Sequence, residues 1–427
     1  MKSAIVVLNI AILLFISYRI WRLEQTSLRN FFWPALMMKL TAGVTLGLIY
    51  AYYYSVGDTF LYFQDGVRLA ALARADAGSY FSFLWRGDES FSVWSELVYQ
   101  QPRAMFLSKI TSVFCLITSD NYWMISLYYS TLSFVGAWFL VKKINTMYKN
   151  VQVPAVLGFL FFPSAVFWSA GVIKESLAMA ALFFLSFIFL KVWHKEKLSW
   201  IEWLMILVSL WMVWSLKYYY LAIFLPVAFT TLTVQYLFTK FTLKSLLAKT
   251  GLWFLIFTVP LLLMSILHPN FYYERLMEVV VSSYYEFQAI SNPEDLIKYD
   301  TLKATPISIL QNVPLALFSG LFRPFVTEAH TALQWLVAFE NLILLILTLV
   351  AAAGFKKSVG SQHRILLFSI IIYATLLCVF LALSTPNFGT LSRYRVGFLP
   401  YLVFMLALEN AVINKLMTLK IFRNLVR

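Results

Sequence analysis

Apolar runs close to or longer than the roughly 18 residues of a transmembrane helix candidate recur along the whole chain. They exclude a single soluble domain that carries one anchor. The composition agrees, because 61% of the residues are hydrophobic and only 13% are charged, against roughly one quarter in soluble proteins. Residues 182–190 and 342–353 are apolar on nearly every face, unlike the alternating strands of a membrane β-barrel. The sequence therefore predicts an all-α, polytopic transmembrane helical bundle, one domain over residues 1–427.

Short loops rich in Lys and Arg separate the runs and set the orientation of the bundle. We expect eleven spans, at about 3–19, 32–54, 121–141, 151–170, 176–193, 200–216, 218–238, 251–267, 334–353, 365–383 and 396–413. The basic loops are about 19–29, 142–149, 194–197, 240–249, 356–364 and 415–427. The positive-inside rule places all of these loops, and the C-terminus, in the cytoplasm. The net charge of +14 is thus a topology signal and does not indicate a nucleic-acid partner.

Two weaker apolar stretches, 104–118 and 307–322, decide the count of spans. Lys109 and Pro314 interrupt them, which favours re-entrant or surface-lying helices. If both stretches instead cross the membrane, the bundle has thirteen spans. The segment with Lys142 and Lys143 would then lie outside, against the charge rule.

On the eleven-span topology, fifteen of the twenty acidic residues lie outside. Acidic residues have little influence on orientation, so this asymmetry indicates folded outer loops that handle a substrate. Two loops are long enough, residues 55–103 and 268–306. A site on the outer face of the membrane, away from the cytoplasm, follows from this topology.

The first outer loop carries the candidate catalytic acids. Asp58 follows the aromatic run Tyr52–Tyr54, which places it at the membrane surface, where a lipid-borne substrate presents its headgroup. It is a candidate general base, and the alternative is that it only caps the next helix. Asp65, seven residues later, is the second candidate because it lies near the same helical face.

Three groups of residues are candidates for binding an anion such as a phosphate. Lys174 and Glu175 lie where two expected spans meet, at the start of a helix with free N–H groups. Lys217 occupies the next outer turn. Snorkelling to the headgroups is the competing explanation for both lysines.

Three arginines in outer loops oppose the positive-inside bias, which favours a specific task for them. They are Arg323, Arg393 and Arg395. An Arg guanidinium suits bidentate phosphate binding, and pairing with the outer acids is the structural alternative.

No cofactor is indicated. The chain has no phosphate-loop or dinucleotide motif, and its two cysteines and four histidines are scattered, so we expect no metal site, although a divalent ion is compatible with the chemistry. The energy for a reaction must then come with the substrate.

The many spans, the acidic loop Gly57–Gly66, the stretch Pro163–Glu175 and the segment Arg393–Arg395 resemble the GT-C superfamily of membrane glycosyltransferases, and also the related bacterial exopolysaccharide polymerases. Asp58 is followed by Thr59, where the family commonly has a second acid. The resemblance implies a GT-C-like fold and a lipid-linked sugar donor, with membrane lipids around the chain and a glycan or protein as acceptor. It also implies a bacterial inner (plasma) membrane as the location, with the site on the periplasmic or outer face.

The resemblance also implies the reaction. The chain is expected to move a sugar from a polyprenyl-phosphate or pyrophosphate carrier to an acceptor hydroxyl, with inversion, Asp58 as base and the lysines and arginines around the phosphate. A transporter or flippase for lipid-linked glycans is the alternative; it needs no base and should show two related halves with broken helices.

Overall fold

The computed structural model describes residues 2–54, 57–241, 246–267, 272–354 and 364–417. Within these ranges every regular element is a helix, and an isolated bridge joins Leu296 to Asn387. The prediction of an all-α bundle is therefore confirmed. Parts of the predicted loops 55–103, 268–306, 240–249, 356–364 and 415–427 lie outside the described residues.

The first half of the chain contains both long helices and short ones. The long α-helices are α1 (Lys2–Arg22), α2 (Arg29–Tyr52), α3 (Asp58–Ala75), α5 (Pro102–Thr118), α6 (Tyr122–Met147) and α9 (Lys174–Trp193). The short elements are α4 (Ala77–Trp85), the 3₁₀ turn η1 (Ser92–Glu96), α7 (Gln152–Val156), the π-helical η2 (Leu157–Phe161) and α8 (Pro163–Phe167).

The second half starts with the longest helix, α10 (Trp200–Lys240). The other long helices are α11 (Leu246–Leu267), α12 (Tyr273–Ile290), α13 (Pro306–Phe322), α14 (Ala332–Gly354) and α15 (Arg364–Ser384). The short elements are η4 (Pro293–Asp295), η5 (Val326–Glu328), α16 (Phe388–Tyr394), η6 (Arg395–Gly397), α17 (Leu399–Ala407) and α18 (Ala411–Met417).

Seven helices of the described chain are long and apolar enough to cross a membrane: α1, α2, α6, α9, α10, α14 and α15. This count is lower than the eleven spans expected, for three reasons. The expected spans 200–216 and 218–238 form one bent helix, α10, and the expected spans 151–170 and 396–413 are each divided into short helices. The expected span 251–267 lies in α11, which counts among the shorter apolar helices over Leu247–Leu262. The length and apolar character of the seven helices support a membrane protein.

The two short stretches that decide the span count form helices of 17 residues each, α5 and α13. Helix α5 packs on α3, and α13 packs on α15. Both are shorter than the roughly 20 residues of a typical spanning helix. Whether they cross the membrane stays a prediction.

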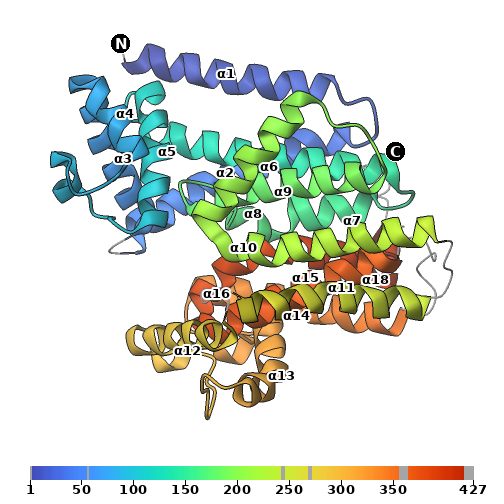
Figure 1. Cartoon of the computed structure of the whole chain (residues 1–427). Helices are drawn as coiled ribbons and strands as arrows, with labels where there is room; N and C mark the ends of the chain where they lie inside the picture. Colours follow the sequence, from blue (N-terminus) through green and yellow to red (C-terminus); the bar gives the residue numbers. More distant parts are fainter. Residues whose placement is uncertain (1, 55–56, 242–245, 268–271, 355–363, 418–427) are drawn as a thin grey trace.

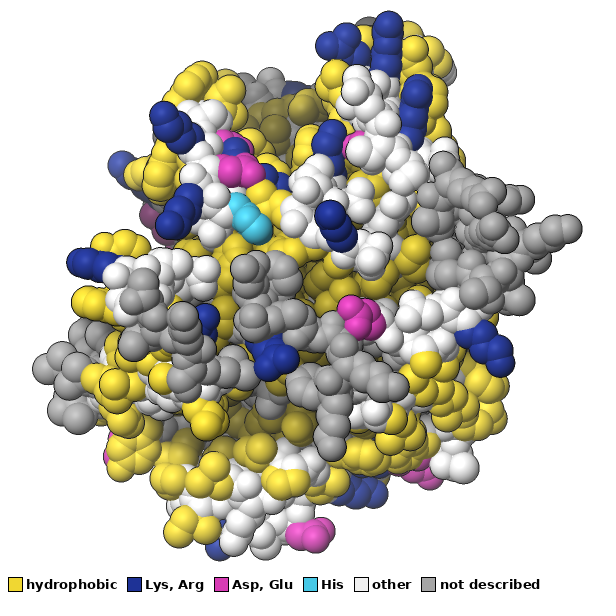
Figure 2. Space-filling view, turned by 90° about the vertical axis from the view of Figure 1, so that its right-hand side faces the viewer, with side chains coloured by type: hydrophobic (Ala, Val, Ile, Leu, Met, Phe, Trp, Pro, Cys, Tyr) yellow, Lys and Arg dark blue, Asp and Glu magenta, His cyan; other side chains and the backbone are white. Residues whose placement is uncertain are grey.

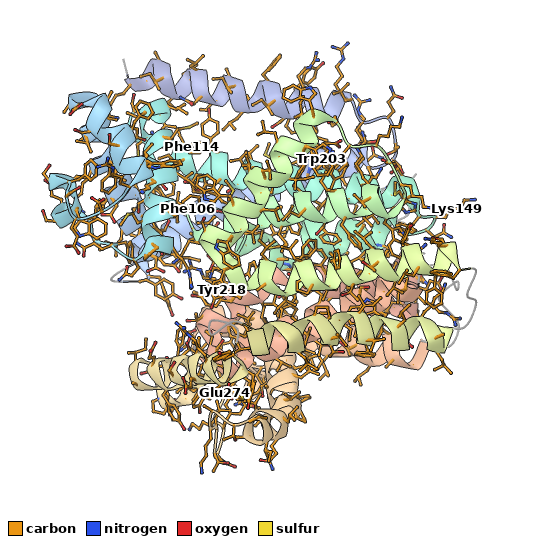
Figure 3. All side chains as sticks on the ribbon, viewed as in Figure 1. Phe106, Phe114, Lys149, Trp203, Tyr218 and Glu274 are labelled. Atoms are coloured by element: carbon orange, nitrogen blue, oxygen red, sulfur yellow. The ribbon has the colours of Figure 1, made fainter. Side chains whose placement is uncertain are left out.

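The two ends of the bundle carry different charged residues. Helices α3, α4 and α12 lie at one end (Figure 1), which we call the acidic end because it carries Asp58, Asp88 and Glu274. The turns after α6 and α9 and the last residues of α10 lie at the opposite, basic end, with Lys149 labelled there in Figure 3. Figure 2 faces the basic end, where Lys and Arg side chains are scattered and Asp and Glu are sparse. This is the charge pattern that the basic loops predict.

Helices α6 and α9 form the centre of the bundle and pack closely on one another. Gly136 permits this approach, because a Cβ there would lie 2.6 Å from the carbonyl oxygen of Ala180. Small residues allow such close helix packing in membranes, where the hydrophobic effect does not drive helices together. The ring of Phe32, on α2, packs edge-on against Trp138 with 4.8 Å between centroids. These contacts hold α2, α6 and α9 together in the bundle.

Candidate active site

Asp58 is the first residue of α3 and lies beside the end of α2. The N-cap residue of α3 is Gly57, and Asp58 is the first residue within the helix. Asp58 is therefore not the cap of this helix. Gly57 is required by the close approach of Tyr50, because a Cβ at Gly57 would lie 2.3 Å from Tyr50 Cδ1. The Asp58 side chain is 44% exposed, which leaves its carboxylate accessible at the acidic end.

Glu175 lies in the first turn of α9. The chain reverses before this helix at Gly171, whose φ of +75° is a left-handed conformation that favours glycine. The backbone N–H of Gly171 donates to Ser130 Oγ at 3.0 Å, which holds the turn against α6. The Glu175 side chain is fully buried at the helix start, where the helix dipole stabilises a negative charge.

Lys217 lies at the bend of α10. Its φ of −146° and ψ of 62° are not helical, so the helix changes direction there. Figure 1 shows the two arms of α10 running in different directions from this point. The expected turn between the two spans is thus a bend, and the buried side chain of Lys217 reaches the start of α9.

These residues form a continuous line of ion pairs with Arg393, which we call the charge cluster. Arg393 Nη1 lies 3.2 Å from Asp58 Oδ2, and Arg393 Nη2 lies 2.9 Å from Glu175 Oε2. Lys217 Nζ lies 2.7 Å from Glu175 Oε1. The cluster therefore runs from an accessible carboxylate to a buried ammonium group, and four predicted site residues meet in it.

Tyrosines enclose the charge cluster. The Tyr99 hydroxyl donates to Asp58 Oδ1 at 2.8 Å, and burial together with this hydrogen bond raises the pKa of Tyr99 above its usual value. Tyr99 thus remains a donor at neutral pH and orients the carboxylate. Lys217 Nζ lies 3.4 Å from the ring centroid of Tyr394, and Lys174 Nζ lies 5.4 Å from that of Tyr62. A ring face stabilises a cation at this range.

The sequence reasoning missed Tyr99, Tyr62 and Tyr394 as parts of the site. Tyr394 stands between two candidate arginines, so its position was a usable signal. Tyr99 lies in an irregular segment 41 residues after Asp58, and no local pattern joins the two.

Asp65 lies in a different environment from Asp58. Its side chain is fully buried and accepts from the backbone N–H groups of Val98 and Tyr99 at 2.9 and 3.0 Å, and from Arg68 Nη1 at 3.0 Å. Both carboxylate oxygens are thus occupied by the protein. This geometry fits an anchor for the segment before α5 better than a base.

Neither Arg323 nor Arg395 has a described side-chain contact with a residue of the charge cluster. Arg323 Nε donates to Glu328 Oε1 and Oε2 at 2.9 and 3.1 Å, and its guanidinium lies 5.0 Å from the ring centroid of Phe388. Arg395 is buried and donates to Asn341 Oδ1 at 2.8 Å and to the carbonyl oxygen of Leu321 at 3.2 Å. The pair with Glu328 fits the alternative considered for Arg323, pairing with an outer acid. Arg395 instead contacts an amide oxygen and a backbone carbonyl oxygen, which also indicates a structural task.

A groove of about 770 Å³ opens between α4, α5 and the first arm of α10. We call it the tryptophan groove; its aromatic and cationic lining residues are Trp85, Trp94, Phe106, Trp211, Trp214, Tyr218, Arg86, Arg103 and Lys109. Phe106 and Tyr218 lie on its facing helices (Figure 3).

The tryptophan groove ends beside the charge cluster. Its lining residues Gln100 and Tyr218 directly follow Tyr99 and Lys217 in the chain. The Arg103 guanidinium lies 4.2 Å from the ring centroid of Tyr218. Exposed tryptophans are typical of the membrane–water interface, so the groove has the lining expected where a lipid meets its headgroup region.

No group of three or more His, Cys, Asp and Glu side chains with metal-binding geometry occurs among the residues that the structure describes. The charge cluster contains two carboxylates, but Arg393 lies between them.

Comparisons of the chain with models of protein families, with curated proteins and with solved structures gave no match.

Proposed function

We propose that this chain is a membrane glycosyltransferase that moves a sugar or glycan from a polyprenyl-phosphate or pyrophosphate carrier to an acceptor hydroxyl. The observation that carries the proposal is the accessible carboxylate of Asp58, held by Arg393 and Tyr99 beside the end of the tryptophan groove. A base, an excess of positive charge and a lipid-compatible groove meet there. The resemblance to the GT-C superfamily supports the same reaction class.

Asp58 is assigned as the base. Tyr99 and Arg393 each occupy one of its oxygens, which orients the carboxylate and leaves lone pairs for an acceptor hydroxyl. As Asp58 takes the proton, the acceptor oxygen forms a bond to the anomeric carbon. The bond from that carbon to the phosphate oxygen breaks, and the carrier phosphate leaves with the electron pair. Attack opposite to the leaving group inverts the anomeric centre.

The phosphate is assigned to the junction of the groove and the charge cluster. Lys174, Lys217 and Arg393 outnumber the carboxylates Asp58 and Glu175, which leaves one positive charge in excess. Arg103 adds a further cation at the groove. Charge-assisted contacts of this kind stabilise a leaving phosphate as its negative charge grows.

The orientation follows from the basic loops. With the basic end in the cytoplasm, the charge cluster faces the outer side of a plasma membrane, and the C-terminus is cytoplasmic. The carrier is then drawn from the outer leaflet, and the acceptor is a glycan or protein on that side.

The experiment is sugar transfer by the purified full-length protein in lipid vesicles, with a panel of polyprenyl-phosphate and polyprenyl-pyrophosphate sugars. Asp58→Asn keeps the size of the side chain and removes the base, so turnover should fall by roughly 10² to 10⁴. Donor binding, measured separately, should change little, and NMR of the product should show inversion.

Asp76→Asn is the matched control. Asp76 is an acid of the same end that caps α4 by accepting from Ser79 N at 3.2 Å, and Asn caps about as well as Asp. This variant should transfer sugar at the wild-type rate. Transfer at the wild-type rate by Asp58→Asn would remove Asp58 as base. Lipid-linked glycan flipping without any transfer would instead favour a transporter.

A further inference from the structure

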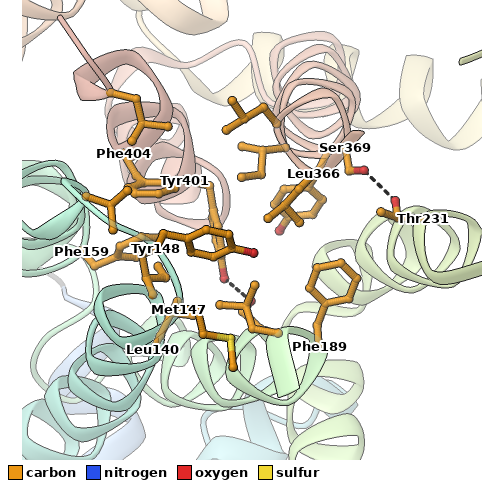
Figure 4. A pocket seen from close by; sticks show the side chains of 18 of the residues that line it. Leu140, Met147, Tyr148, Phe159, Phe189, Thr231, Leu366, Ser369, Tyr401 and Phe404 are labelled. Atoms are coloured by element: carbon orange, nitrogen blue, oxygen red, sulfur yellow. Dashed lines mark hydrogen bonds between the residues drawn. The ribbon is translucent and has the colours of Figure 1, made fainter. Parts of the chain in front are cut away.

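A second opening lies far from the charge cluster, at the basic end of the bundle. It has a volume of about 460 Å³ and lies between α6 and α9 on one side and α10, α15 and α17 on the other. Figure 4 shows side chains of Leu140, Phe159, Phe189, Leu366 and Phe404 around this space. We call it the basic-end pocket.

The polar groups on the pocket wall already have protein partners. Tyr401 Oη lies 2.7 Å from Ser186 Oγ, and Thr231 Oγ1 lies 2.6 Å from Ser369 Oγ, both drawn in Figure 4. The Tyr373 hydroxyl donates to the carbonyl oxygen of Gly397 at 2.9 Å. A polar ligand would find few unoccupied hydrogen-bonding groups there, whereas a hydrocarbon chain needs no hydrogen-bond partner. The interior therefore suits an apolar occupant.

The mouth of the pocket has a different chemistry. It contains Lys149 in the turn after α6 and Glu409 in the turn after α17. Both side chains are exposed, and within the described ranges no ion pair involves either of them. Because Lys149 and Glu409 are not paired with one another, a lipid headgroup with both a negative and a positive charge would find a partner of opposite sign for each.

The turn that carries Glu409 is held in place. Glu409 has a φ of +49°, and the neighbouring Asn410 donates from Nδ2 to the carbonyl oxygens of Leu347 and Leu406 at 3.1 and 2.9 Å. Glu409 thus stands at a defined place on the rim of the pocket.

We propose that the basic-end pocket binds one acyl chain of a zwitterionic phospholipid, with its phosphate at Lys149 and its ammonium group at Glu409. Four of the helices that form the wall, α6, α9, α10 and α15, have the length and composition of membrane spans. The hydrocarbon available beside such helices is a lipid chain.

The test is native mass spectrometry of the purified full-length protein in detergent, titrated with palmitoyl-oleoyl phosphatidylethanolamine. The protein should retain one such lipid per chain. Ala228→Phe places a ring in the pocket and should weaken retention by about tenfold or more, since a filled cavity leaves no room for the chain. Ala222→Phe, at an exposed position on the same arm of α10, is the control and should retain the lipid.

The headgroup is tested with palmitoyl-oleoyl phosphatidylglycerol, which has the same chains and no ammonium group. The wild type should prefer phosphatidylethanolamine, and Glu409→Lys, on the exposed rim, should shift the preference to phosphatidylglycerol. Equal retention of the two lipids by the wild type would overturn the headgroup assignment. Unchanged retention by a folded Ala228→Phe variant, or absence of retained lipid in the wild type, would overturn the site. These measurements use no sugar donor, so their outcome does not depend on the proposed transferase activity.

Discussion

Asp58 and Asp65 are carboxylates of one helix, seven residues apart, with opposite surroundings. Asp58 is 44% exposed, and Asp65 is fully buried because residues 97–99 fold back over it. The local sequence nominates both, with Asp65 second because it lies near the helical face of Asp58. It could not predict that Asp65 is occupied by the protein, because the N–H groups that it accepts from belong to residues 33 and 34 positions later.

Asp65→Asn should lower stability and leave the chemistry intact. The amide would place its N–H₂ group against one of the two backbone N–H donors, and a buried group without a partner costs about 1–3 kcal/mol. We expect a lower thermal midpoint in detergent, with sugar transfer per folded molecule unchanged. The control is Asp88→Asn, where the carboxylate accepts from Ser90 N at 3.1 Å on the surface. A wild-type midpoint for Asp65→Asn would contradict the anchoring role.

Arg393→Ala should weaken donor binding by about 1.5–3 kcal/mol, which is typical for the loss of a charge-assisted hydrogen bond. Arg393→Lys should recover only part of this, because one ammonium replaces two nitrogens that contact two different carboxylates. The measurement is donor affinity in lipid, with folding followed by thermal midpoint.

Arg74→Ala is the control for the arginine variants. Arg74 forms a bidentate pair with Asp120 at 2.8 and 2.9 Å at an exposed position, which contributes about 0–1 kcal/mol to stability. Donor affinity should remain at the wild-type value. If both Arg393 variants bind donor as the wild type does, Arg393 is structural.

At the scale of elements, two interruptions of helices create the charge cluster. The turn at Gly171 starts α9 at Lys174, and the non-helical residue Lys217 bends α10 so that its side chain meets Glu175. The sequence predicted that a helix is interrupted at each of these places, because two apolar runs meet there. It could not give the direction of the Lys217 side chain, which depends on the backbone angles at the bend and on the packing of α10 against α9.

Gly171→Ala should destabilise the fold and reduce transfer together. A left-handed conformation costs a residue with a Cβ about 1–2 kcal/mol, and the added Cβ would lie 3.2 Å from Leu46 Cδ2. The expected result is a lower thermal midpoint and weaker donor binding. Gly251→Ala in α11 is the control, since a Cβ there meets nothing within 4 Å. Equal midpoints for the two variants would show that the turn tolerates a side chain.

At the scale of the whole molecule, charge is sorted by end. The sequence predicted this sorting and the helical class, because both depend on patterns that are local in the chain. The number of spans was harder to predict, since hydropathy does not distinguish a bent helix such as α10 from two spans joined by a turn. The partners of the charged residues lie far apart in sequence, and only the packed bundle brings Asp58 to Arg393.

Cysteine labelling tests this arrangement. Ser90→Cys at the acidic end should react with a membrane-impermeant reagent from outside intact cells, and Asn150→Cys at the basic end should react only after the membrane is opened. The native Cys115 and Cys378 are buried and give little background. A reporter fused after Arg427 should read cytoplasmic. Labelling of Ser90→Cys from the cytoplasm alone would reverse the topology and the assignment of the donor leaflet.

Helix α10 forms part of two openings, one on each side of its bend. Trp211 and Trp214 of the first arm line the tryptophan groove, and Phe224 and Thr231 of the second arm line the basic-end pocket. If the affinity at each opening depends on the angle at Lys217, thermodynamic linkage requires that each occupant changes the affinity of the other by the same factor. Binding of the sugar donor in the groove would then follow the phospholipid composition of the surrounding bilayer.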